Sequence, residues 1–397
     1  MRQRNRTSAW GIFLRFLRLG CTSFGGPVAH LGYFREEFVN RLGWIADETF
    51  AEIVALCQSL PGPASSQVGF TIGLMEGGLW GAVAAWTGFT LPSAVLMFGF
   101  AYGRPFLSGK LGNGILHGLQ LAAVAVVAQA VLGMSRTLTP DRRRLLIAAA
   151  AAVLVLVIRS ANGQLIALAI GAVAGLVLCR GRGRGNGEWR IAVSRKTSAI
   201  AAVLFVVLLL GLPLWVAVKP LPTMELFSAF YRSGALVFGG GHVVLPLLER
   251  VTVARGWVSE ATFLVGYGGA QALPGPLFTF AAYLGAVCKP LPGLRGAVVA
   301  LVGIFLPGLL LVISVLPWWN WLRSSAPMQA AIAGVNASVV GVLLAALYRP
   351  VWTTSVTSVW DVLIVLLGFV LLVRVKVKPL LVVALVALCG AGERFVL

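Results

Sequence analysis

A Pro-Gly-Pro motif occurs twice in this chain, within Gln58-Ser59-Leu60-Pro61-Gly62-Pro63-Ala64-Ser65-Ser66 and within Gln271-Ala272-Leu273-Pro274-Gly275-Pro276-Leu277-Phe278-Thr279. We call Pro61–Pro63 the first break and Pro274–Pro276 the second break. Apolar segments flank both of them. Proline lacks a backbone donor and clashes with the preceding helical turn, so a helix cannot continue straight through either break. If the breaks lie in a bilayer, their freed backbone must be buried in protein or face water.

The composition predicts an integral membrane protein. Of the 397 residues, 58% are hydrophobic and only 11% are charged, whereas soluble domains carry roughly 25% charged residues. The net charge is +19, but the basic residues gather in short clusters between apolar spans. That pattern is typical of cytoplasmic loops and argues against nucleic-acid binding. We therefore expect an all-α polytopic helical bundle whose main surroundings are the lipid bilayer.

Apolar runs define the expected helices. The segments 48–60 and 64–75 on either side of the first break are each shorter than the ~20 residues that a crossing needs, so they predict a hairpin of half-helices. Residues 10–30 predict an amphipathic or partly inserted helix. Longer spans are expected at 79–103, 114–135, 145–158, 163–179, 198–218, 293–318, 327–348 and 355–374, with partial insertion at 379–391.

The two halves of the chain repeat the same landmarks. Gly43-Trp44 and Pro61 recur 213 positions later as Gly256-Trp257 and Pro274, and further matches lie 214 or 215 positions apart. Such agreement indicates an internal duplication. We predict an N-terminal repeat at 1–180, a basic cytoplasmic linker at 181–197, and a C-terminal repeat at 198–397 that begins with a connecting helix at 198–218.

The distribution of Lys and Arg predicts the orientation of the repeats. Basic clusters in short loops should be cytoplasmic, and the clearest are Arg2–Arg6, Arg136–Arg144, Arg180–Lys196, Arg323 and Arg374–Lys378. If both hairpins are re-entrant, the remaining spans leave the C-terminal repeat starting outside. The two repeats are then inverted relative to each other, although Arg250, Arg255, Lys289 and Arg295 would lie outside, against the rule.

Broken helices in corresponding halves are the best sequence indication of a transporter's binding site. A half-helix that starts at a break presents free N–H groups and the positive end of its dipole, which suits an anion. The first half is the more polar side. The residues expected at the site are Gln58, Pro61, Gly62, Pro63, Ser65, Ser66 and Gln67 at the first break, and Gln271, Pro274, Gly275, Pro276 and Thr279 at the second.

Glycine clusters and one arginine recur near both breaks. Phe24-Gly25-Gly26 and Gly239-Gly240-Gly241 permit close backbone approach, either to a ligand or to a packed helix. Arg18 and Arg232 lie 214 positions apart in matching contexts. A charge at membrane depth is costly, so each arginine is a candidate for contact with a tetrahedral oxyanion. The alternative is that both arginines extend to the lipid headgroups.

Candidate proton carriers are His30, Glu52 and His242, none of which has an aligned counterpart in the other repeat. A packed or interfacial histidine is the alternative for His30 and His242. Asp361 also falls inside an apolar stretch and is a further candidate. His117 begins a span and is expected at the interface.

Other classes of site are disfavoured. The five cysteines are far apart without CxxC spacing, so we expect no metal site and no disulfide framework. Walker loops, paired-histidine metal motifs and nucleophile elbows are missing. The sequence therefore predicts neither an enzyme nor a cofactor, and it argues against an ATP-driven pump.

Four paired motifs resemble those of the chromate ion transporter family in its long, two-domain form: Phe24-Gly25-Gly26-Pro27-Val28-Ala29-His30, Leu60-Pro61-Gly62-Pro63, Phe238-Gly239-Gly240-Gly241-His242 with Pro246, and Gln271-Ala272-Leu273-Pro274-Gly275-Pro276. The resemblance covers essentially the whole chain. It implies an inner-membrane carrier that exports chromate, an analogue of sulfate, driven by the proton-motive force. It also implies duplicated domains of opposite orientation.

Several alternatives stay open at this point. Sulfate or another oxyanion could be the substrate, since tetrahedral dianions of similar size are hard to distinguish by sequence. An uncoupled anion channel is a second class of function, and a membrane-embedded enzyme or scaffold is a third. The difference between Ser65-Ser66 and Phe278-Thr279 argues against a fully symmetric site. A homodimer is one candidate assembly.

Overall fold

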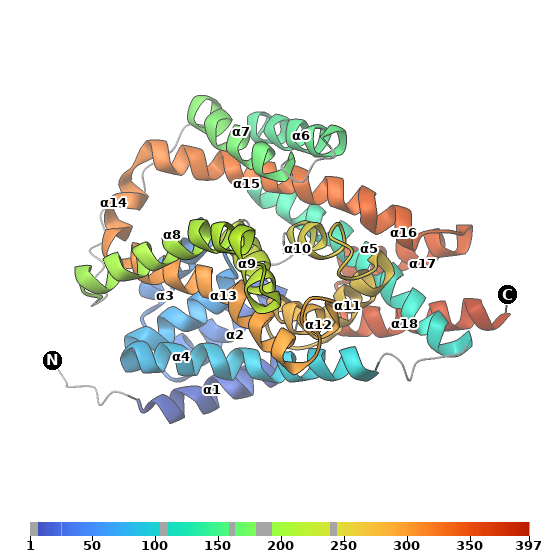
Figure 1. Ribbon diagram of the computed structural model, residues 1–397, viewed down its shortest axis with the longest axis horizontal. Coiled ribbons are helices and arrows are strands. Elements are labelled where there is room, and N and C mark those ends of the chain that lie inside the picture. Colours follow the sequence, from blue (N-terminus) through green and yellow to red (C-terminus); the bar gives the residue numbers. More distant parts are fainter. Residues whose placement is uncertain are drawn as a thin grey trace. The chain divides into compact units, whose positions relative to one another are not determined.

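Helices form all the regular structure in the computed structural model, which describes residues 7–24, 26–103, 110–158, 163–179, 193–238 and 244–396 (Figure 1). No strand occurs in these ranges, so the prediction of an all-α protein is confirmed. Five helices are long and apolar enough to cross a membrane. They are α4 (Ala64–Gly103), α5 (Lys110–Leu138), α8 (Arg195–Val218), α13 (Leu294–Val315) and α15 (Ala326–Ala346).

The chain forms two compact units that do not follow the predicted repeats. The first unit comprises residues 1–99, 189–241 and 273–317, and the second comprises 100–188, 242–272 and 318–397. Each predicted repeat therefore contributes helices to both units. Both Pro-Gly-Pro breaks fall in the first unit.

The first unit holds most of the elements that precede and follow the two breaks. Besides α4, α8 and α13, it contains α1 (Ala9–Thr22), α2 (Gly26–Phe34), η1 (Arg35–Arg41), α3 (Asp47–Ser59), α9 (Pro222–Ala235), η4 (Leu277–Thr279) and α12 (Phe280–Val287). The Ser8 side chain caps α1, and Ser23 ends it in an extended conformation. The single helix expected at 10–30 is therefore two helices, because Ser23 is extended and Gly26 has a positive φ of 77°.

The second unit packs through small residues. Its elements besides α5 and α15 are α6 (Arg142–Val157), α7 (Gly163–Leu178), α10 (Val244–Thr252), α11 (Glu260–Ala272), α14 (Trp319–Ser324), η6 (Leu347–Trp352), α16 (Thr353–Ser355), α17 (Val359–Val370), η7 (Leu371–Val375) and α18 (Pro379–Val396). Gly175 of α7 lies against Gly334 of α15, and Gly118 of α5 lies against Gly390 of α18. Close backbone approach at small residues is the usual way membrane helices associate.

Glycines with positive φ occur in pairs across the two repeats. The pairs are Gly43 and Gly256 (55° and 68°), Gly62 and Gly275 (124° and 91°), and Gly78 and Gly293 (64° and 93°). Gly78 kinks α4 at the place where the half-helix 64–75 and the span 79–103 were expected to separate. Its counterpart Gly293 is the N-cap of α13. The two repeats thus share unusual backbone conformations, which side-chain similarity alone would not require.

Corresponding helices also cross in the same way. In the first unit, Gly88 of α4 lies against the carbonyl of Phe13, and the matching Gly303 of α13 lies against the carbonyl of Phe227. The pair α1 and α4 is therefore the counterpart of the pair α9 and α13.

One expected segment differs in length from the observed helix, and another lies mostly outside the described residues. The span expected at 355–374 is a shorter α17 followed by η7, which ends at Val375 before the left-handed Lys376. Most of the predicted linker at 181–197 lies outside the described residues, and α8 begins at Arg195.

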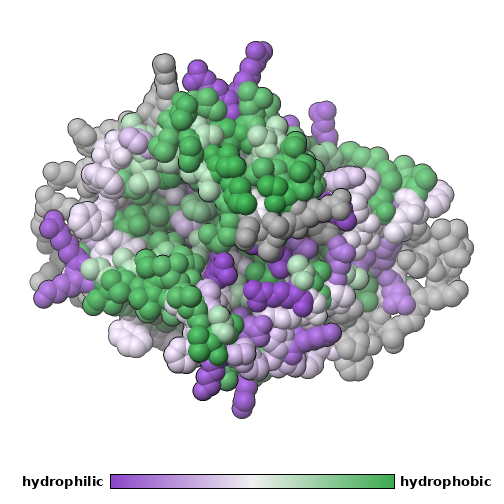
Figure 2. All heavy atoms as spheres, turned by 45° about the horizontal axis from the view of Figure 1, so that its top comes forward, coloured by the Kyte–Doolittle hydropathy of each residue, from purple (hydrophilic) through white to green (hydrophobic). Residues whose placement is uncertain are grey.

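Apolar side chains cover much of the molecular face drawn in Figure 2. Helix α8 illustrates the reason, because only 6% of its most apolar window is buried. Val203, Leu210 and Val218 are among its exposed side chains. So long an apolar helix exposes far more hydrophobic surface than water tolerates, and its length suits a bilayer.

Candidate functional site

The two breaks make the same backbone hydrogen bond, each to the other repeat. The Gly62 N–H donates to the Val237 carbonyl at 2.6 Å, and the Gly275 N–H donates to the Ser23 carbonyl at 2.9 Å. Ser23 and Val237 are matching residues, and each directly precedes the Phe-Gly-Gly segment of its repeat. Each break is therefore tied to the segment that directly precedes the Phe-Gly-Gly motif of the opposite repeat.

The first break leads into the N-terminus of α4, where the polar residues are buried. Ser65, Ser66 and Gln67 are at most 3% exposed. The Gln67 amide donates to the Pro61 carbonyl at 2.9 Å and to the Gly308 carbonyl at 3.0 Å, which holds the break against α13. Within the described part of the chain, Ser66 Oγ and Gln67 Oε1 have no hydrogen-bond partner.

Backbone amides at this helix start are also available. The first bond of the α4 ladder runs from Gln67 N–H to the Pro63 carbonyl at 2.9 Å. The amides of the preceding residues, Ala64–Ser66, therefore have no acceptor within the helix. Together with the two serine hydroxyls and the helix dipole, they form an arrangement suited to an oxyanion.

His30 of α2 lies beside this helix start. Its Nδ1 is 3.3 Å from Ser65 Oγ, and its ring stands edge-on to Phe89 at 5.2 Å between centroids. Burial lowers the pKa of His30 to about 4, an effect that the Ser23 backbone partly opposes. His30 is therefore neutral at physiological pH unless an anion comes close to it.

The second break is less polar, as the sequence predicted. The Thr279 hydroxyl donates to the Pro276 carbonyl at 2.8 Å, and Leu277 and Phe278 beside it are buried. A side chain on Gly275 would meet Ser93 Oγ of α4 at 2.7 Å. Near Ser93, Thr90 Oγ1 is buried and lacks a hydrogen-bond partner among the described residues.

The remaining predicted site residues are spread over several elements. Arg18 is exposed on α1, Arg232 is half-buried on α9, and Gln58 is exposed at the end of α3. Phe24 and Gly26 are half-buried around the start of α2, and Glu52 is half-buried in α3. Gln271 lies in the last turn of α11 in the second unit. Gly25, Gly239, Gly240, Gly241 and His242 lie outside the described residues.

The second unit contains a cavity of about 310 Å³ with charged walls. Its polar lining consists of Gln164, Glu249, Arg250 and Arg349, and the Gln164 amide donates to the Pro246 carbonyl at 3.2 Å. Burial and the nearby Glu260 raise the pKa of Glu249 to about 7, and Arg250 opposes that rise. The sequence analysis did not identify this cavity, because its lining comes from several helices that are distant in the chain.

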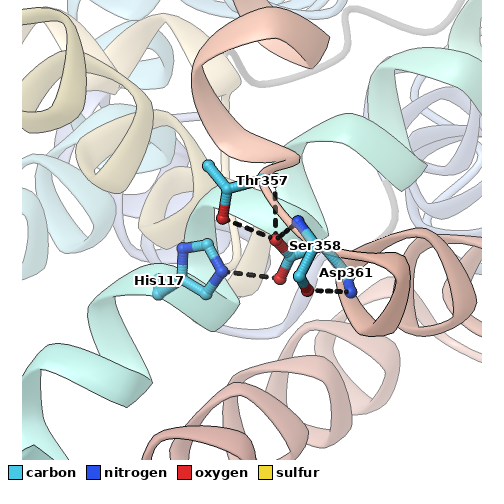
Figure 3. Close-up of polar contacts among 4 residues, drawn as sticks. All are labelled: His117, Thr357, Ser358 and Asp361. Carbon is cyan, nitrogen blue, oxygen red and sulfur yellow. Dashed lines mark hydrogen bonds and ion pairs between the residues drawn. The ribbon is translucent and has the colours of Figure 1, made fainter.

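A buried contact between two ionisable residues of the second unit was also missed. His117 Nε2 lies 2.7 Å from Asp361 Oδ1, and the two side chains are 9% and 0% exposed (Figure 3). His117, which was expected at the membrane interface, has its ring covered by the helices around α5. The sequence does show an ionisable residue in each of two apolar stretches. It does not show that the two residues, which are 244 positions apart, contact each other.

Comparison with known proteins identifies the family. The family model described as chromate transporter matches residues 10–176 and 224–391, one match in each half. The chain belongs to the chromate transporter family. Among its relatives, a chromate transport protein of Pseudomonas aeruginosa is 29% identical over 350 residues, which are 84% of this chain and 78% of the relative. A chromate transport protein of Cupriavidus metallidurans is 27% identical over 384 residues, 96% and 92% of the two chains.

A shorter relative matches less than half of this chain. An uncharacterized transporter of Bacillus subtilis is 31% identical over 175 residues, which are 43% of this chain but 87% of the relative. Its length is therefore close to that of one predicted repeat. No solved structure matches the chain.

Proposed function

We propose that this protein is a secondary transporter that exports chromate across the cell inner membrane, driven by the proton-motive force. Membership of the chromate transporter family and the names of two relatives support the substrate. The long apolar helices support a multi-pass membrane protein. The potential across a cell membrane favours export, because each negative charge that moves to the positive outside gains ~2.3 kcal/mol per 100 mV.

The observation that carries the proposed site is the reciprocal bonding of the two breaks, Gly62 to Val237 and Gly275 to Ser23. A dianion would bind at the first turn of α4, held by the amides of Ala64–Ser66 and the hydroxyls of Ser65 and Ser66. The other predicted residues at the breaks and in the glycine clusters would complete the site. Arg18 and Arg232 would supply positive charge near it.

The same bonds suggest how the transporter would move. Inverted repeats, if the predicted domain boundaries and orientation hold, permit rocking of one repeat against the other around a fixed site. Because each break is hydrogen-bonded to the opposite repeat, displacement of one repeat would shift the break of the other. His30, next to Ser65, is the first candidate for the coupled proton, with Glu52 and His242 as further candidates.

Everted membrane vesicles provide the test. We expect chromate accumulation that depends on the imposed gradient, that stops when a protonophore collapses it, and that sulfate reduces by competition. Flux that persists without the gradient would instead indicate a channel. Absence of any gradient-dependent accumulation would remove the substrate assignment.

Variants of the site sharpen this test. The double change Ser65→Ala and Ser66→Ala should lower the chromate uptake rate about tenfold, since two charge-assisted bonds are lost. Ser324→Ala, which alters an exposed serine of α14, is the matched control and should leave uptake unchanged. Arg18→Gln and Arg232→Gln should each weaken uptake. Unchanged uptake in both would reduce these arginines to headgroup anchors.

A further inference from the structure

The buried pair His117 and Asp361 joins two helices of the second unit. His117 lies in the second turn of α5, and Asp361 lies in the first turn of α17. Their side-chain contact is the 2.7 Å approach of Nε2 to Oδ1 (Figure 3). An ionisable pair inside an apolar helical unit is costly to bury and has a functional role by default.

Asp361 does not need His117 to satisfy its carboxylate. Its other oxygen, Oδ2, accepts bonds from the Thr357 N–H at 2.8 Å, the Thr357 hydroxyl at 3.0 Å and the Ser358 N–H at 2.9 Å. A capping box with Ser358 fixes it further at the start of α17. These donors and the positive end of the helix favour the charged carboxylate. These bonds already complete the helix cap at Asp361. Capping therefore does not explain the further contact between the Asp361 carboxylate and the His117 imidazole.

The surroundings of the pair hold few other ionisable groups. Glu260 is the residue next to Ala261, whose carbonyl accepts a bond from the Gln120 side chain of α5 at 3.3 Å. Gln120 lies one turn from His117, so Glu260 begins α11 near the pair. On the other elements that pack on α5, the ionisable residues with described side chains are Tyr267, Tyr348, Arg349, Arg374 and Cys389. Arg136 of α5 itself lies ~28 Å along the helix from His117.

Two carboxyl groups of the second unit lie close to each other, at the charged cavity and at the start of α11. Glu260 interacts electrostatically with Glu249, which lines the charged cavity. Glu249 thus lines the cavity, and Glu260 begins the helix whose Ala261 bonds to α5 one turn from His117. Chains of acidic residues and histidines of this kind serve as proton relays in membrane transporters.

We propose that His117 and Asp361 form a proton-binding site of the transport cycle, a proposal that rests on the proposed proton-coupled function. The imidazole takes up a proton from the aqueous side and becomes an imidazolium held by the Asp361 carboxylate. It releases the same proton when the pair becomes accessible to the opposite side. No other bond is formed or broken, and the site lies in the second unit, whereas both Pro-Gly-Pro breaks lie in the first.

The test separates coupling from transport in proteoliposomes. His117→Gln keeps a side-chain donor toward Asp361 but cannot carry the proton. We expect this variant to keep chromate–chromate exchange within about twofold of wild type and to lose at least about tenfold in proton-driven chromate accumulation. Asp361→Asn should behave in the same way. Accumulation by His117→Gln equal to wild type would overturn the proposal, as would a parallel loss of exchange and accumulation in a folded protein.

A structural control and an independent readout complete the design. Ser358→Ala removes a cap bond without removing an ionisable group, so it should lower the unfolding temperature and keep coupling. The chain has three histidines, so NMR of ¹⁵N-labelled imidazoles gives three sets of signals, and the set lost in His117→Gln belongs to His117. We expect that set to change when the pH of the sample is varied, as proton uptake by the imidazole requires. A His117 signal that stays constant over the pH series would overturn the proton site, even if the wild type moves chromate. A wild type without chromate flux whose His117 signals change with pH would contradict only the proposed function.

Discussion

At the scale of single residues, Gly62 and Gly275 connect backbone conformation to the candidate site. Both have positive φ, and both donate the hydrogen bond that ties a break to the opposite repeat. Any other residue would be strained in this conformation. It would also bring a side chain against Gln67 and Gly308 in one case and against Ser93 in the other. The two glycines are therefore required by geometry, whatever the ligand is.

We expect Gly62→Ala and Gly275→Ala each to lower the free energy of unfolding by ~1–3 kcal/mol, because backbone strain and steric contact add at these positions. The measurement is the thermal unfolding midpoint in detergent. Gly99→Ala in α4, the helix that follows the first break, is the control, since a Cβ there meets nothing within 4 Å. Unfolding of Gly62→Ala at the wild-type temperature would contradict the prediction.

Glu249 is expected to make stability depend on pH. Burial is the main reason that its pKa rises from the ordinary value of 4.5 to about 7. Between these two pH values the folded state binds more protons than the unfolded state, so the free energy of unfolding should fall as pH rises through about 7. Glu249→Gln should flatten this part of the profile, as measured by unfolding temperature at a series of pH values. An identical slope in the variant would show that another group causes it.

At the scale of elements, small residues set how closely helices approach. Gly171 and Gly175 of α7 lie directly against Gly334 of α15, so that the two backbones touch without intervening side chains. The same arrangement joins α5 and α18 through Gly118 and Gly390. Hydropathy predicts that these helices exist, but only the tertiary contacts reveal which faces meet.

Gly334→Ala should separate α7 from α15, because the added Cβ would overlap the Gly171 carbonyl. We expect a loss of ~1–3 kcal/mol in the free energy of unfolding. Gly133→Ala in α5 of the same unit serves as control, since its Cβ would enter open space. Equal unfolding temperatures for the two variants would indicate that the α7–α15 crossing is looser than the structure implies.

Gln67 connects the first break to α13. Gln67→Leu keeps the approximate volume but leaves the Pro61 and Gly308 carbonyls without this donor. We expect Gln67→Leu to lower the free energy of unfolding by ~1–3 kcal/mol, because buried carbonyls lose their hydrogen-bond donor. Gln58→Leu, at an exposed position of α3, should have little effect on the unfolding temperature. If both changes act equally, the Gln67 bonds do not hold the hairpin.

At the scale of the whole molecule, the repeats and the compact units are different divisions of the chain. The family model matches each half separately, yet each compact unit contains segments of both halves. Both breaks share the first unit, while the charged cavity and the His117–Asp361 pair belong to the second. The two matched halves therefore bring their equivalent Pro-Gly-Pro motifs into one compact unit, while the cavity and the buried pair lie in the other.

The predicted inversion of the repeats can be tested with matching residues. Leu79 and Leu294 are equivalent positions next to Gly78 and Gly293, and both are exposed. In a background with the exposed Cys21 changed to Ser, Leu79→Cys should react with a membrane-impermeant thiol reagent only after permeabilisation. Leu294→Cys should react in intact cells. Labelling of both from the same side would exclude an inverted arrangement.

The sequence by itself determined the all-helical class, the two breaks and the repeated glycines. These features depend on local chemistry: apolar run length, the missing proline donor, and the freedom of glycine at positive φ. Tertiary structure decided which residues meet. The bonds from Gly62 to Val237 and from Gln67 to Gly308, and the pairing of His117 with Asp361, join positions far apart in the chain. No local pattern encodes such contacts, because they depend on how whole helices pack.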